Sequence, residues 1–191
     1  TKIADEKMRI DGGDIRFTTA SGTQLSYWFD PATFNTTSTE FWVKVPTLPL
    51  GVTTLYLYYG NPSAPFVASG DATFELFDDF EASELSTYKW TRCGDISNVE
   101  VSGGYLYLKS SVANKEGVIY SIEDFSTTVI VEADVLNALN GKSYLGFVNS
   151  TKKGYATTME YTGFANVMKM SKLESDVTYC QKLTDVSPSQ N

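Results

Sequence analysis

Residues 41–63, FWVKVPTLPLGVTTLYLYYGNPS, decide the fold class. In 41–45 and again in 55–59, side chains of alternating positions point to opposite faces, as they do along a half-buried β-strand. Both runs are rich in aromatic and β-branched residues, which favour a pleated surface. Pro46 and Pro49 cannot lie in a central strand, so the chain must turn between the runs. The stretch therefore predicts a hairpin-like pair of strands.

The rest of the sequence continues this pattern, with turn residues about every eight to twelve positions, the spacing of an all-β sandwich. The only helix-like piece is 82–88, and the nearly uncharged Gly/Pro-rich segment 60–72 is the best candidate for a domain boundary. We predict an all-β chain of two β-sandwich modules, at 1–66 and 72–191. Further strands are expected at 15–18, 24–29, 98–101, 105–110, 117–121, 127–136, 143–149, 155–162, 166–173 and 177–183.

Composition excludes several classes of function. The chain has 191 residues, a net charge of −8 and no histidine. Without histidine there is no Ser-His-Asp or Cys-His nucleophile and no histidine zinc site, and no phosphate-binding glycine loop occurs. The acidic balance argues against nucleic acid as a partner, and no apolar run reaches the roughly 20 residues that span a bilayer. These features favour a protein that is not an enzyme.

Two glycosylation sequons suggest a secreted or cell-surface chain, and that location bears on the state of the two cysteines. Cys93 and Cys180 lie far apart in the sequence and either pair in a disulfide or stay as two buried thiols. Asn35 and Asn149 each begin an Asn-X-Ser/Thr triplet, the acceptor for N-glycosylation. We expect the disulfide, because an extracellular location permits it.

Three segments, DGGDIRFTTASGTQLSYWF, FWVKVPTLPLGVTTLYLYYGNPSA and FDDFE, occur in this order and resemble an uncharacterised β-domain of archaeal and bacterial surface proteins. The resemblance covers residues 7–64. That domain commonly precedes a concanavalin A-like (laminin-G-like) jelly roll. The segment FDDFEASELSTYKW resembles the usual opening of that jelly roll. VSGGYLYLKS, GVIYS and VIVEADV are similar to the strands that follow. The resemblance implies a surface protein whose second module is a jelly roll.

The chain departs from this family pattern at both ends. Family members usually have an additional strand before KMRIDGGDIRF, and the jelly roll normally continues through a second set of strands. One explanation is truncation. The other is self-assembly by strand exchange, in which residues 1–8 or 183–191 of a neighbouring subunit supply the missing strand. Head-to-tail repetition of that contact would give a filament.

Two groups of aspartates are candidate sites for a structural calcium ion, which prefers oxygen ligands and needs no histidine. Asp71, Asp78 and Asp79 lie at the entrance to the jelly roll, where related folds often hold calcium. Asp11 and Asp14 in a Gly-rich loop are a second possibility. The alternative is that both groups are solvated turn aspartates.

Five aromatic residues are candidates for glycan binding, which needs exposed rings that stack on sugars. The same rings could instead fill the cores, and we expect packing to be the main role of those in 41–63. The candidates are Trp28, Trp42, Tyr56, Tyr58 and Trp90.

The alternative from another class is a glycan-active hydrolase or its carbohydrate-binding accessory domain. Glycosidases need two carboxylates on either side of the sugar, and Glu132 and Asp134 share one face of the strand expected at 127–136. A third acidic residue, expected from the family's catalytic strand, is missing. The preferred hypothesis is therefore a non-enzymatic extracellular or cell-surface protein for adhesion, glycan binding or filament assembly, whose partners are glycans or other surface proteins.

Overall fold

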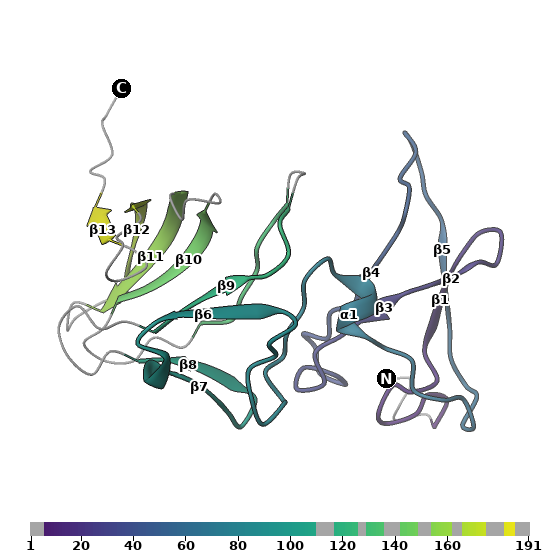
Figure 1. Ribbon diagram of the computed structural model, residues 1–191. Coiled ribbons are helices and arrows are strands. Elements are labelled where there is room, and N and C mark those ends of the chain that lie inside the picture. Colours follow the sequence, from purple (N-terminus) through teal and green to yellow (C-terminus); the bar gives the residue numbers. More distant parts are fainter. Residues whose placement is uncertain are drawn as a thin grey trace. The chain divides into compact units, whose positions relative to one another are not determined.

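A computed structural model describes residues 6–109, 117–125, 129–135, 142–148, 154–161, 166–174 and 182–185. The chain divides into two compact units, Thr1–Asp79 and Phe80–Asn191. Strands dominate the described residues and helix is limited to two short pieces, which confirms the all-β prediction (Figure 1). The sandwich and jelly-roll arrangements remain predictions.

The first unit is built from very short antiparallel strands. Strand β1 lies between β2 and β5 in one sheet, and β3 pairs with β4 in another. The described elements of this unit are β1 (Arg16–Thr19), β2 (Gln24–Leu25), β3 (Tyr27–Trp28), β4 (Trp42–Val43), β5 (Leu55–Tyr58) and α1 (Gly70–Thr73).

Strands β4 and β5 do not pair with each other, so the predicted hairpin is wrong in its pairing. Trp42 in β4 lies opposite Trp28 in β3, and Leu57 in β5 lies opposite Phe17 in β1. The connection 46–54 is too long for a tight turn, and its two prolines lack the N–H groups that a continuous ladder would need. Each strand therefore pairs with a partner from the earlier part of the chain.

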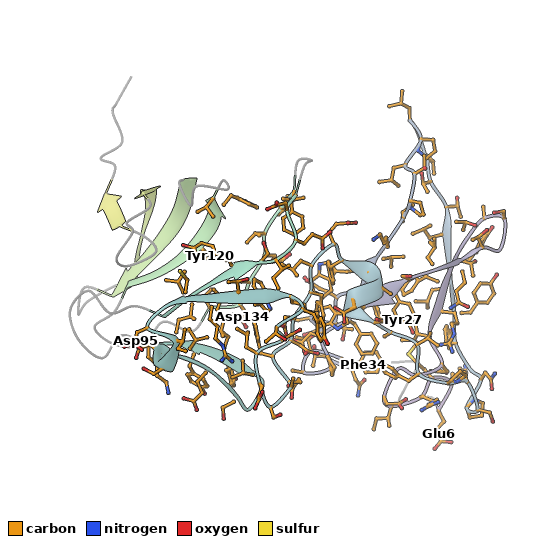
Figure 2. All side chains as sticks on the ribbon, viewed as in Figure 1. Glu6, Tyr27, Phe34, Asp95, Tyr120 and Asp134 are labelled. Carbon is orange, nitrogen blue, oxygen red and sulfur yellow. The ribbon has the colours of Figure 1, made fainter. Side chains whose placement is uncertain are left out.

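The core of the first unit follows the period-two alternation of the sequence. Its buried members are Ile15, Phe17, Leu25, Tyr27 and Phe29. The rings of Phe17 and Tyr27 lie 5.2 Å apart, edge to face. Tyr27 (Figure 2) also donates its hydroxyl hydrogen to the backbone carbonyl of Ile15 at 2.7 Å, so its buried polar atom is satisfied.

The segment expected to be a domain boundary belongs to the first unit. Val67 and Ala68 pack against its core, and the Ser69 N–H donates to the carbonyl of Tyr27 at 2.9 Å. The Ser69 hydroxyl then caps α1 by accepting the N–H of Ala72. The division between the units consequently falls after Asp79, later than the expected boundary between residues 66 and 72.

The second unit contains three separate antiparallel sheets among its described residues: β6 with β9, β7 with β8, and β10 to β13 in chain order. Its core brings together Leu85, Val99 and Val101. The elements are β6 (Trp90–Gly94), η1 (Ile96–Asn98), β7 (Val99–Ser102), β8 (Tyr105–Leu108), β9 (Gly117–Ser121), β10 (Lys142–Val148), β11 (Gly154–Tyr161), β12 (Asn166–Glu174) and β13 (Lys182–Asp185).

Two sequence-based assignments in this unit differ from the structure, and a third lies mostly outside the described residues. The piece 82–88 is not helical, since it is too short for a stable helix and Leu85 is anchored in the core. Residues 129–135, the described part of the strand expected at 127–136, form no strand, and Ile130 there is almost fully exposed. Of the strand expected at 177–183, residues 177–181 lie outside the described part, and β13 begins at Lys182.

Candidate interaction surface

Strand β5 lies at the edge of its sheet and is exposed along its whole length. The exposed fractions of Leu55, Tyr56, Leu57, Tyr58 and Tyr59 range from 37% to 55%. Strand β1 pairs with one side of β5, and no strand in the described residues pairs with the other side. An apolar, unpaired strand edge is a favoured site for contact with another chain.

The connection from β4 to β5 carries further exposed apolar side chains. Leu48 is largely exposed, and Leu50 and Val52 are almost completely exposed. Gly51 has a φ of 103°, a left-handed conformation that suits glycine at the tip of this connection. Figure 1 shows the connection running from β4 out to a tip and back into β5.

We call the exposed apolar residues of this connection and of β5, on both of its faces, the apolar edge. Residues 45–70 contain no charged side chain, although the chain carries a net charge of −8. The segment that bears the apolar edge therefore brings no charge of its own into a contact with a partner. The absence of charge was visible in the sequence, but the exposure of the leucines was not. The apolar edge consists of Leu48, Leu50, Val52, Leu55, Tyr56, Leu57, Tyr58 and Tyr59.

Two of the five candidate glycan-binding aromatics lie in a separate aromatic cluster. The rings of Trp28 and Trp42 lie 5.2 Å apart across the β3–β4 pair. Phe74 and Phe77 pack on Trp28 at ring distances of 5.9 and 4.9 Å. All four side chains are half-buried, so both tryptophans act in packing within the first unit. Glycan binding by these tryptophans stays a prediction.

The other three candidate aromatics occupy two different settings. Trp90 packs against the core of the second unit, and its ring lies 6.3 Å from that of Phe80. Tyr56 and Tyr58 are exposed on β5, opposite Thr18 and Arg16 respectively. Within the first unit, Tyr56 and Tyr58 are the candidates with exposed rings.

Asp11 and Asp14, the second calcium candidate, are engaged by protein donors. Arg9 donates to both carboxylate oxygens of Asp11, at 2.9 and 2.5 Å, and the Gly13 N–H donates at 3.0 Å. The hydrogen bond from Arg9, and then the one from Gly13, lower the pKa of Asp11. The buried Asp14 accepts the backbone N–H groups of Arg9 at 3.1 Å and Gly60 at 2.7 Å. This arrangement favours a structural clamp over a calcium site.

Two arginines extend this clamp to the segment after β5. Arg9 donates to the carbonyl of Ala64 at 2.5 Å, and Arg16 donates to the carbonyl of Pro65 at 2.6 Å. Sequence reasoning gave neither arginine a role. Their position on either side of the DGGD loop was a signal, but their acceptors are backbone atoms about 50 residues away, with sequence separations of 55 and 49.

The acidic candidates for calcium and for catalysis do not assemble into a site in the described residues. Asp71 lies in the first turn of α1, and Asp78 and Asp79 follow near the end of the first unit. Among the residues that the structure describes, no three Asp, Glu, Cys or His side chains are placed to hold a metal ion. Glu132 and Asp134 are exposed on a segment that is not a strand, so they do not share a strand face as expected. Asp134 is labelled in Figure 2.

The predicted modification sites are only partly described. Asn35 is exposed and has a φ of 61°, in a turn of the first unit. Asn149 and Cys180 lie outside the described residues. Cys93, in β6, is disulfide-bonded. Glycosylation and the pairing of Cys93 with Cys180 stay predictions.

Residues 11–93 match a family described as "Domain of unknown function (DUF2341)", so the chain carries a DUF2341 domain over this range. The match includes the loop of Asp11 and Asp14, every strand of the first unit and the apolar edge. No curated protein and no solved structure matches the chain. In the described part of the molecule, no helix is long and apolar enough to cross a membrane.

Proposed function

We propose that the chain is a non-enzymatic extracellular or cell-surface protein whose first unit mediates assembly or adhesion. The observation that carries this proposal is the apolar edge, in which leucine, valine and tyrosine side chains lie exposed within a segment free of charge. Exposed apolar patches of this kind are typical of protein–protein contact sites. Burial of these apolar side chains against a partner is favourable because it removes apolar surface from water.

The apolar edge supports a protein partner better than a glycan partner. A glycan site combines a stacking ring with several convergent polar groups that fix the orientation of the sugar. Tyr56 and Tyr58 supply rings, and Thr18 and Arg16 lie opposite them on the same face of the sheet. The Arg16 guanidinium, however, already donates to the backbone carbonyls of Gly13 and Pro65. Glycan binding by these two tyrosines is the second candidate function.

The hydrolase alternative receives less support. Glycosidases hold two carboxylates about 5–10 Å apart on rigid elements. Glu132 and Asp134 are both exposed on a segment without strand structure, which provides no such rigidity. Turnover of a polysaccharide that is lost in Glu132→Gln or Asp134→Asn would establish the hydrolase instead.

Replacement of the three residues at the tip tests the assembly function. We expect the full chain to self-associate in sedimentation velocity, with the association weakened at least tenfold when Leu48, Leu50 and Val52 all become serine. The matched control is Tyr88→Ser, which removes an exposed apolar side chain from the second unit and should leave the association unchanged. Equal association of the triple variant and the wild type would contradict the proposal.

A further inference from the structure

The backbone of β5 has hydrogen-bonding groups that point away from its sheet. The Thr19 N–H donates to the Thr23 carbonyl at 2.9 Å, on the β2 side of β1. Thr19 therefore turns its backbone groups away from Leu55, its neighbour in β5, and the two form a non-hydrogen-bonded pair. By the alternation of an antiparallel ladder, the N–H and C=O groups of Leu55 and Leu57 face outward from the sheet.

We propose that this edge binds β5 of a second copy of the chain in an antiparallel pair, joining two β2-β1-β5 sheets into one. The inference rests on the proposed assembly function and names its partner. In the joined sheet, Leu57 of one copy lies opposite Leu57 of the other. Leu55 then lies opposite Tyr59, and Tyr56 lies opposite Tyr58.

The geometry of the edge restricts the register, and the number of paired residues selects it. Outward backbone groups must meet outward backbone groups, so the odd-numbered residues of the two strands pair with one another. With Leu57 on the two-fold axis, every position from 55 to 59 has a partner, whereas sliding one strand by two residues leaves only three paired positions. One face then carries the leucines and Tyr59, and the other face carries Tyr–Tyr pairs, which aromatic cross-strand contacts stabilise.

The side chains extend surfaces that already exist in the first unit. Leu57 lies opposite the core residue Phe17, so the odd-numbered residues of β5 share the face that bears the core. Pairing therefore continues an apolar face across the new contact. Tyr56 and Tyr58 share the other face with Thr18 and Arg16, and Arg16 donates hydrogen bonds to the carbonyls of nearby backbone.

The self-matching pattern of apolar and aromatic residues in 55–59 and the backbone edge of β5 favour a second copy as the occupant. The repulsion between two chains of net charge −8 opposes self-association, and it is weakest where the contact is made through residues 45–70, which carry no charge. A lipid surface would leave the outward N–H and C=O groups of β5 without partners. A strand that matches itself under a two-fold axis gives a closed dimer, because both copies present the same patch.

A charge-reversal pair tests the register. Leu57→Lys and Leu57→Glu each place like charges opposite one another across the two-fold axis, so each variant alone should self-associate at least tenfold more weakly than the wild type. An equimolar mixture brings lysine opposite glutamate and should restore the association in sedimentation velocity. The control pair, Leu50→Lys and Leu50→Glu, lies at the tip and off the axis, so its mixture should show no such recovery.

A cysteine variant gives a second readout in case a charge at this position disturbs folding. Opposed residues of a hydrogen-bonded antiparallel pair have Cα atoms about 5.5 Å apart, within disulfide range. Oxidised Leu57→Cys should therefore link two chains, and oxidised Leu50→Cys should not.

Three results would overturn the β5 pairing: unchanged association of both Leu57 charge variants, failure of their mixture to recover, or no linked dimer of Leu57→Cys. If the triple serine variant at the tip still weakens association in that case, the assembly function stands and only the partner strand is wrong. A wild-type chain that stays monomeric at all concentrations would remove both proposals.

Discussion

Replacement of Asp14 by alanine is expected to destabilise the first unit by about 2–4 kcal/mol. The carboxylate is only 3% exposed and accepts the N–H of Gly60 at 2.7 Å and that of Arg9 at 3.1 Å. A hydrogen bond to a charged group contributes about 1.5–3 kcal/mol, and we count the shorter bond in full. The bond to the half-buried Arg9 is counted in part, because water can replace the lost acceptor there.

Hydrogen exchange read by mass spectrometry measures this loss where it occurs. The Asp14 carboxylate joins the loop before β1 to Gly60, which closely follows β5. The alanine variant should therefore lose protection from hydrogen exchange in β1 and β5 together. Asp14→Asn keeps one acceptor oxygen, so its stability and its protection from exchange should lie between those of Asp14→Ala and the wild type. The control, Glu75→Gln, removes the same charge from an exposed ion pair with Lys44 and should cost less than about 0.5 kcal/mol. A loss below about 1 kcal/mol in Asp14→Ala, or unchanged protection of β5, would refute the clamp.

Three further predictions follow from single contacts. Burial raises the pKa of Tyr27, so the neutral phenol stabilises the folded state fully below about pH 10, and this contribution is lost as the pH rises through the higher pKa of the folded state. Tyr27→Phe should therefore reduce the alkaline loss of stability, measured by urea unfolding at a series of pH values. Gly117→Ala should lower the stability of the second unit by about 1–3 kcal/mol in thermal unfolding, because the new Cβ would lie 2.5 Å from the Asn98 carbonyl oxygen. Non-reducing peptide mass spectrometry should find Cys93 linked to Cys180, and two free thiols would contradict this.

Local sequence patterns were sufficient to predict strands. The alternation in 15–18, 55–59 and 117–121 depends only on which face each successive side chain takes, and strands form in all three places. The same reasoning failed at 129–135, because a strand also needs a neighbour with which to form its ladder. The role of Asp14 could not be predicted for a related reason. One of its hydrogen-bond donors is the backbone N–H of Gly60, which no local sequence motif connects to Asp14.

The sequence by itself determined the all-β class and the uncharged character of residues 45–70, since both are properties of composition and of alternation along the chain. Only the tertiary structure decided which strands pair and which faces are covered. Phe17 and Leu57 are apolar residues on the same face of neighbouring strands, yet Phe17 is 9% exposed and Leu57 is 42% exposed. Burial depends on what other segments bring against a side chain, and for that reason the apolar edge became visible only in the folded chain.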